Sequence, residues 1–188
     1  PGAPATIAEA FVEWRKRNPP SVDGKTGAGT DEPPQRKALV IVLMTSGIYR
    51  GRFNFTLHIN ETVALVAAPQ TRPVLWLTDE SAGASDAITI RGGAGSRVIL
   101  DGLLIAGRAV EVSNERVGTD DDTQQNSVAA PAQFCELWIR HSTLVPGNSL
   151  HPNCDPRRPS EPSLIVDDTS ACVRIEASIL GAIRVLHE

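Results

Sequence analysis

The first residues of the chain carry apolar side chains at the spacing of an amphipathic helix. Apolar residues recur at positions i, i+3, i+4 and i+7, which is the pattern of one helical face. These residues are Ile7, Ala10, Phe11 and Trp14. Thr6 can cap the start, with Glu9 three residues later to complete a capping box. Asn18, Pro19 and Pro20 then end the pattern, so we predict a helix over 6–17.

After Ala38 the pattern changes to short apolar runs separated by glycine, proline or polar clusters. The runs cover 39–44, 53–59, 63–67, 74–77, 88–91 and 98–105. Runs of this length, rich in Val and Ile and bounded by turn residues, are typical of β-strands. No stretch with helical periodicity lies between them, which argues against a doubly wound α/β fold.

The second half of the chain contains an internal repeat. Three segments share an apolar residue, a charged residue, a turn-like pair and an apolar pair, followed by glycine: 97–107, 137–147 and 173–181. A second short apolar segment follows each of them, at 109–112, 163–166 and 182–185. A repeated unit that cannot bury its apolar face alone indicates stacked coils.

In this alignment of the repeats, charged residues and turn residues fall into separate columns. Asp101, Arg140 and Glu176 share one column, which predicts an outward ladder of ion pairs. The neighbouring column holds the corner residues Gly102, His141 and Ala177. We also expect Ile99, Ile139 and Ile175 to lie in one layer.

The predicted fold is all-β: a right-handed parallel β-helix, or solenoid, with an N-terminal capping α-helix. An antiparallel sandwich or barrel is the competing fold, and it would explain the strands but not the repeat. We expect the capping helix within 1–20, a loop or linker over 21–37, and coils over 38–188. Two long insertions, 113–133 and 148–162, account for the uneven repeat spacing. Because the pattern stops in mid-coil, we expect the coils to continue beyond Glu188.

Two strand motifs add a family resemblance. The segment Val-Ile-Val-Leu-Met-Thr-Ser-Gly-Ile-Tyr (40–49) and the segment Ile-Thr-Ile-Arg-Gly-Gly (88–93) follow a short amphipathic helix. This order resembles the opening of the pectin-lyase-like β-helix superfamily, in which an N-terminal helix plugs the first coil. The resemblance implies a fold more than an activity, because the superfamily includes lyases, esterases, glycosidases, tail-spike proteins and inert adhesin shafts.

Composition and charge narrow the function classes. The net charge of −4 argues against a nucleic-acid partner, because a protein that binds nucleic acid is usually basic. No apolar run approaches the ~18 residues of a membrane span. Aromatic residues make up 4% of the chain, so the core must consist of Val, Ile, Leu and Ala, which suit stacked strands. The sequence indicates no localisation.

Candidate chemistry rests on a few charged residues. If the chain acts on carbohydrate, the candidate catalytic residues are Asp101, Arg140, Asp167 and Asp168. No cofactor and no metal are predicted. The acidic run 120–122 lacks the spacing of an EF-hand, and the pair His151 and Cys154 lacks further zinc ligands.

Smaller motifs have structural interpretations. Cys135 and Cys172 precede repeat strands and are expected to be small buried residues, although a disulfide between them is left open. The glycine-rich segment 91–96 leads into a strand, which indicates a turn and not a phosphate loop. Asn60 begins a glycosylation sequon.

Three functional hypotheses follow from the sequence. The first is a non-enzymatic structural or binding β-helix segment of a larger bacterial or phage-like protein. The second is a carbohydrate-active enzyme, a lyase or hydrolase, whose partner is a polysaccharide. The third is an assembly module that forms a homo-oligomer through an open C-terminal coil.

Overall fold

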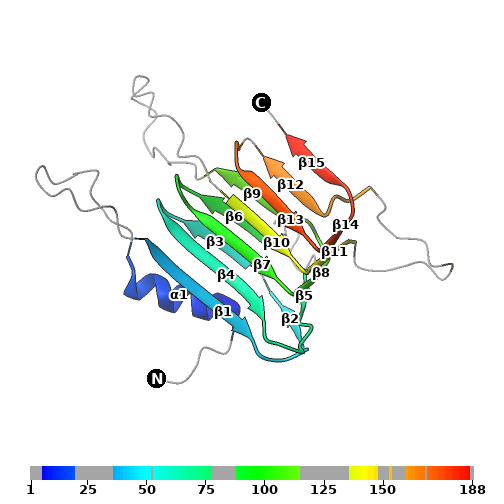
Figure 1. The fold of residues 1–188 in the computed structure, drawn as a ribbon, viewed down its shortest axis with the longest axis horizontal. Coiled ribbons are helices and arrows are strands. Elements are labelled where there is room, and N and C mark those ends of the chain that lie inside the picture. The colour runs from blue at the N-terminus through cyan, green and yellow to red at the C-terminus, as the bar shows by residue number, and fades with distance from the viewer. Residues whose placement is uncertain are drawn as a thin grey trace, which may run out of the picture.

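A computed structural model describes residues 6–19, 36–51, 53–77, 88–114, 136–147, 153, 160–167 and 169–186. One helix precedes fifteen strands in these ranges (Figure 1). The elements are α1 (Ile7–Arg17), β1 (Lys37–Leu43), β2 (Ile48–Arg50), β3 (Phe53–Leu57), β4 (Glu61–Ala67), β5 (Val74–Trp76), β6 (Ile88–Gly92), β7 (Arg97–Asp101), β8 (Leu104–Gly107), β9 (Val110–Asn114), β10 (Glu136–Arg140), β11 (Thr143–Pro146), β12 (Leu164–Asp167), β13 (Cys172–Glu176), β14 (Ile179–Leu180) and β15 (Ile183–Leu186).

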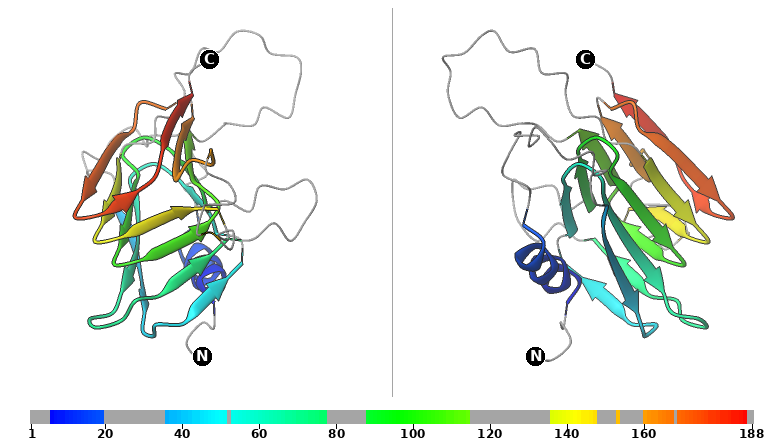
Figure 2. Two further views of the ribbon diagram at one scale, coloured as in Figure 1. Left: turned by 90° about the vertical axis from the view of Figure 1, so that its right-hand side faces the viewer. Right: turned by 60° about the vertical axis from the view of Figure 1, so that its left-hand side comes forward.

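The strands wind into a parallel β-helix of five coils. Every third strand joins the same sheet, in the orders β1-β4-β7-β10-β13, β2-β5-β8-β11-β14 and β3-β6-β9-β12-β15, which we call sheets A, B and C. All pairs between these strands are parallel. Figure 2 shows the sheets enclosing a common interior. The predicted fold class is therefore confirmed, and the antiparallel sandwich or barrel is excluded.

The core consists of aliphatic rows that run along the axis of the solenoid. In sheet A one inward row is Ile41, Leu65, Leu100, Ile139 and Ile175. Sheet C contributes the row Phe55, Ile90, Val112, Val166 and Val185. Each side chain packs on the residue one coil away, at the ~4.8 Å spacing of paired strands. A coil can therefore bury its inward face only when another coil lies over it.

The layer predicted for Ile99, Ile139 and Ile175 is wrong at one position. Ile139 pairs with Ile175 as expected, but its partner in the preceding coil is Leu100. Ile99 pairs with Trp138 on the outer face and is half-buried. Because successive residues of a strand point to opposite faces, the one-residue shift moves Ile99 from the interior to the surface.

The corner between sheets A and B is tight in the last three coils. Gly102, His141 and Ala177 occupy it with φ values of 74°, 47° and 46°, in the left-handed region. A single left-handed residue between two extended segments turns the chain sharply from one sheet into the next. The column predicted for these three residues is confirmed, and the apolar run 98–105 is two strands separated by this corner.

The N-terminal helix closes the first coil, as predicted. Thr6 is its N-cap, with reciprocal hydrogen bonds to Glu9 that complete the capping box. Phe11 packs edge-on against Phe55, and Ile7 is buried in the core. In Figure 2 the helix lies at the end of the solenoid that holds the first coil.

Candidate functional site

The three outer faces of the solenoid differ in chemistry. The outer face of sheet A is mainly apolar in its first two coils and carries charged residues in its last three. Sheet B presents mainly apolar residues, among them Ile48, Val74, Trp76, Leu104 and Val145. Sheet C presents mainly polar ones, among them Thr89, Arg91, Glu111, Ser113 and Asp167. No helix in the described residues is long and apolar enough to cross a membrane.

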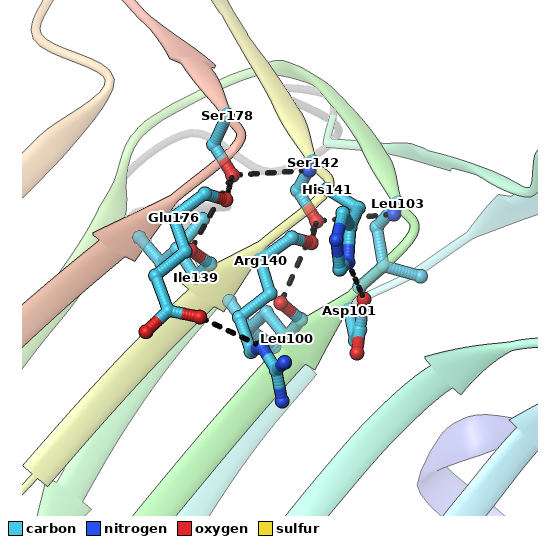
Figure 3. Close-up of polar contacts among 9 residues, drawn as sticks. All are labelled: Leu100, Asp101, Leu103, Ile139, Arg140, His141, Ser142, Glu176 and Ser178. Atoms are coloured by element: carbon cyan, nitrogen blue, oxygen red, sulfur yellow. Dashed lines mark hydrogen bonds and ion pairs between the residues drawn. The ribbon is translucent and has the colours of Figure 1, made fainter.

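The charged column predicted on sheet A exists, but its ion pairs differ from the prediction. Asp101, Arg140 and Glu176 are consecutive partners on β7, β10 and β13. Arg140 Nε lies 3.1 Å from a carboxylate oxygen of Glu176. The Asp101 carboxylate instead contacts Nδ1 of His141 at 2.9 Å (Figure 3). The left-handed corner brings the imidazole of His141 over the preceding coil, so Asp101 is paired with the corner residue.

Trp138 lies beside this column and is surrounded by arginines. The guanidinium carbons of Arg97, Arg174 and Arg140 lie 5.3, 5.2 and 6.0 Å from the indole centroid. Arg97 also binds Glu136 through Nε at 2.6 Å. Because cations are attracted to the face of an indole ring, these contacts link three successive coils. The same guanidiniums occupy the surroundings of the ring, which leaves it poorly suited to stack on a sugar.

The serines near the corner serve the backbone. The Ser142 hydroxyl donates to the Arg140 carbonyl at 2.7 Å and accepts from the Leu103 amide at 3.1 Å. The Ser178 hydroxyl accepts from the Ser142 amide at 3.1 Å in the next coil (Figure 3). These side chains satisfy backbone groups that the corner leaves without a partner in a strand. They extend the coil-to-coil hydrogen bonding around the turn.

Of the candidate catalytic residues, the structure brings Asp101 and Arg140 together and places Asp167 elsewhere. Asp167 ends β12 on the outer face of sheet C, a different sheet from β7 and β10. Asp168 lies outside the described residues. Sequence reasoning missed Glu111, which points outward from β9 and pairs with Ile165, two residues before Asp167. The alternation of Val110, Glu111 and Val112 is the signal that could have found it.

The register gives an approximate backbone separation for these two acidic residues. One strand spacing of ~4.8 Å and two residues of ~3.3 Å along the strand place the Cα atoms of Glu111 and Asp167 about 8 Å apart. Both are half-buried on the same face. A separation of ~6.5–9.5 Å is the one that inverting glycosidases use.

The described residues contain no group of three or more His, Cys, Asp or Glu side chains that could hold a metal ion. The acidic run 120–122 and the pair His151 and Cys154 lie outside those residues. Cys172 is a free and exposed thiol, not the buried residue that was expected, because it belongs to the outer face of the last coil. Cys135 lies outside the described residues.

The glycine-rich segment is a turn between β6 and β7, as predicted. Asn60 and Gly95 face each other in adjacent coils. The backbone N–H of Asn60 donates to the Ala94 carbonyl at 2.9 Å. A Cβ on Gly95 would overlap the Asn60 side-chain oxygen. This close approach explains the glycine at position 95, where φ is 71°.

The two ends of the solenoid differ. At the first coil, α1 and β1 line an open pocket of about 730 Å³ whose lining includes Trp14, Leu39 and Tyr49. At the last coil the inward rows are open. Ile139 is 0% exposed but its partner Ile175 is 40% exposed, and Val166 is 7% exposed but its partner Val185 is 53% exposed. The last coil therefore presents core side chains to the surface.

Comparisons with known proteins assign no family. No protein-family model matches the chain, and no curated protein or solved structure matches it.

Proposed function

We propose that this chain is a structural β-helix module that joins a further β-structured unit through its last coil. The observation that supports the proposal is the exposure of Ile175, Ile183 and Val185 on inward rows that are buried in the preceding coils. The free edges of β13, β14 and β15 accompany these side chains. An exposed strand edge next to apolar side chains is a template for pairing with other strands.

The charged residues of sheet A support the same proposal. Arg97, Arg140 and Arg174 contact Trp138 or carboxylates of neighbouring coils. Such contacts connect one coil to the next, which is a structural task. The likeness to pectin-lyase-like proteins is compatible with this role, since that superfamily includes non-enzymatic shafts, and membership in it is part of the proposal.

A labelled peptide with the sequence of residues 172–186 tests whether the last coil accepts β-structure. We expect the peptide to bind the chain, as measured by fluorescence anisotropy. The Val185→Lys variant of the chain should bind the peptide at least tenfold more weakly, because a charge would then lie on the apolar inward row. Ile179→Ser is the matched control, because Ile179 belongs to the same coil but points outward from sheet B. Equal binding by the Val185→Lys variant, or no binding by the unmodified chain, would contradict the proposal.

Carbohydrate cleavage is a second candidate, favoured by the pair Glu111 and Asp167. Cα atoms about 8 Å apart on one face let the two carboxyl groups reach the separation of ~6.5–9.5 Å that inversion requires. Arg91 and Ser113 share the outer row of Asp167 and could contact substrate hydroxyl or carboxylate groups.

Polysaccharides with acidic and neutral sugars, assayed for reducing ends, test this second candidate. Activity should fall more than a hundredfold in both Glu111→Gln and Asp167→Asn, and NMR should show products of inverted configuration. Glu136→Gln is the control, because Glu136 lies on sheet A and is not a candidate catalytic residue. No reducing ends from any polysaccharide, or equal activity in all three variants, would eliminate it.

A further inference from the structure

We propose that the last coil pairs with the last coil of a second copy of this chain, forming a two-fold dimer in which β13 lies antiparallel to the partner's β13 about Ile175. This inference rests on the proposed function, and it names the partner. It is argued from three features of β13: the direction of its free backbone groups, the order of its charges and the exposure of its inward row.

The backbone directions follow from one hydrogen bond. The Glu176 carbonyl accepts from the His141 amide at 3.1 Å, so it points toward β10. Backbone groups of successive strand residues point to opposite edges. The N–H and C=O of Ile175 therefore point to the free edge. When two such strands meet antiparallel with Ile175 opposite the partner's Ile175, each residue donates one hydrogen bond to the other.

The charges select this register. With Ile175 on the two-fold axis, Arg174 lies opposite the partner's Glu176, and Glu176 lies opposite the partner's Arg174. Both belong to the outer face, and both side chains are 53% exposed. Centring the pairing on Arg174 would place two arginines opposite each other, and centring it on Glu176 would place two glutamates opposite each other. Opposite charges across an antiparallel pair stabilise it, and like charges destabilise it.

The inward rows add apolar contact. Ile175, Ile183 and Val185 lie at the open end. Ile175 would meet the partner's Ile175, and Ile183 and Val185 of sheet C would face the partner's sheet B, because a two-fold axis normal to sheet A exchanges sheets B and C. At the other end, α1 covers the first coil, with Phe11 against Phe55. Because one end of the described solenoid is covered and the other is open, pairing stops at two copies and does not produce a filament.

A charge-reversal cycle tests the register. The variants are Arg174→Glu, Glu176→Arg and the double variant, and the dimer dissociation constant is measured by sedimentation equilibrium of the 188-residue chain. Each single reversal places like charges opposite each other twice per dimer. We expect a rise in the dissociation constant of about tenfold or more. The double variant should recover the original value to within about threefold.

The recovery separates contacts between copies from contacts within one chain. Arg174 lies near Trp138 and Glu136, and Glu176 lies near Arg140. In the double variant the side chain at position 174 carries the same charge as Glu136, and the side chain at position 176 carries the same charge as Arg140. Contacts inside the chain therefore become worse, and restored dimerisation can come only from pairing between copies. Circular dichroism melting of each variant identifies any loss of fold.

Cross-linking gives a second measure that does not depend on charge. In a background with Cys135, Cys154 and Cys172 replaced by serine, Ile175→Cys should form a disulfide-linked dimer on mild oxidation. Directly opposed residues of a hydrogen-bonded pair have Cα atoms ~5.5 Å apart, within disulfide range. Val173→Cys is the control, because two copies of that residue would lie four positions apart and should not link.

The outcomes separate this inference from the proposed function. A chain that stays monomeric but binds the 172–186 peptide overturns the dimer and leaves the proposed function standing. A chain that dimerises without recovery in the double variant, or that cross-links equally through position 173, overturns the register. A monomeric chain that binds no peptide overturns both.

Discussion

Arg15 forms a paired hydrogen bond with Glu61, joining α1 to the start of β4. Nη1 donates to Oε1 at 2.7 Å and Nη2 donates to Oε2 at 2.8 Å, and the Glu61 side chain is only 2% exposed. Glu61 also accepts from the His58 amide, and Arg15 donates to the Thr56 carbonyl. The capping helix is therefore attached by a buried carboxylate to the junction between the first and second coils.

Removing the arginine should destabilise the protein more than removing both charges. In Arg15→Met the Glu61 carboxylate stays buried without its partner, at an expected cost of about 3 kcal/mol in the free energy of unfolding. The double variant Arg15→Met with Glu61→Met should lose less, because no buried charge remains. Urea unfolding of both variants measures the difference, and a double variant that loses as much stability as Arg15→Met would contradict the prediction.

The left-handed corner predicts opposite effects for two substitutions in one column. Ala177→Gly should stabilise the fold by about 1 kcal/mol, because alanine at φ 46° is strained and glycine is not. Gly102→Ala should destabilise it by more than about 1 kcal/mol, since the new Cβ would also lie 2.8 Å from the Ala67 Cβ. Thermal unfolding compares them. A change in melting temperature of the same sign in both variants would show that the left-handed corner does not control their stability.

The register of sheet A predicts which of two isoleucines belongs to the core. Ile139→Ala should lower the free energy of unfolding by about 3 kcal/mol, because Ile139 is fully buried between Leu100 and Ile175. Ile99→Ala should cost less than about 1 kcal/mol, because Ile99 lies on the outer face. Chemical denaturation of the two variants decides between this register and one shifted by a residue.

Ser142 should stabilise the corner through its hydroxyl. In Ser142→Ala the buried Leu103 amide loses its acceptor, which should cost about 2 kcal/mol. Ser178→Ala is a matched comparison one coil later, where the site is more exposed, and it should cost less. Hydrogen exchange of the Leu103 amide should rise in the first variant. Unchanged exchange there would mean that another group satisfies the amide.

The winding could be predicted because its signals are local. Val and Ile in short runs predict strands, and the repeated order of charge, turn and glycine aligned Asp101, Arg140 and Glu176 correctly. Ile99 was misplaced because Val98, Ile99 and Leu100 are all apolar. A continuous apolar run contains no alternation to show which residue points inward.

The side-chain contacts between elements depend on positions far apart in the chain. Arg15 and Glu61 are separated by 46 positions, and no periodicity connects a helix residue to a strand in another coil. The pairing of Asp101 with His141 depends on a left-handed φ at the corner. Sequence spacing predicted a shared column, but it could not predict that the imidazole would replace the guanidinium of Arg140 as the partner of Asp101.

The constant register across uneven connections has a consequence for how such a chain changes over time. Strands β9 and β12 stay aligned with each other, although residues 115–135 and all of β10 and β11 lie between them. The side chain that can be accepted at a position then depends mainly on the residue one coil above or below it. Substitutions should be accepted in vertical sets, such as Leu100 with Ile139, while lengths between strands drift freely. Two descendants of one ancestor could keep the same interior and share almost no alignable loops.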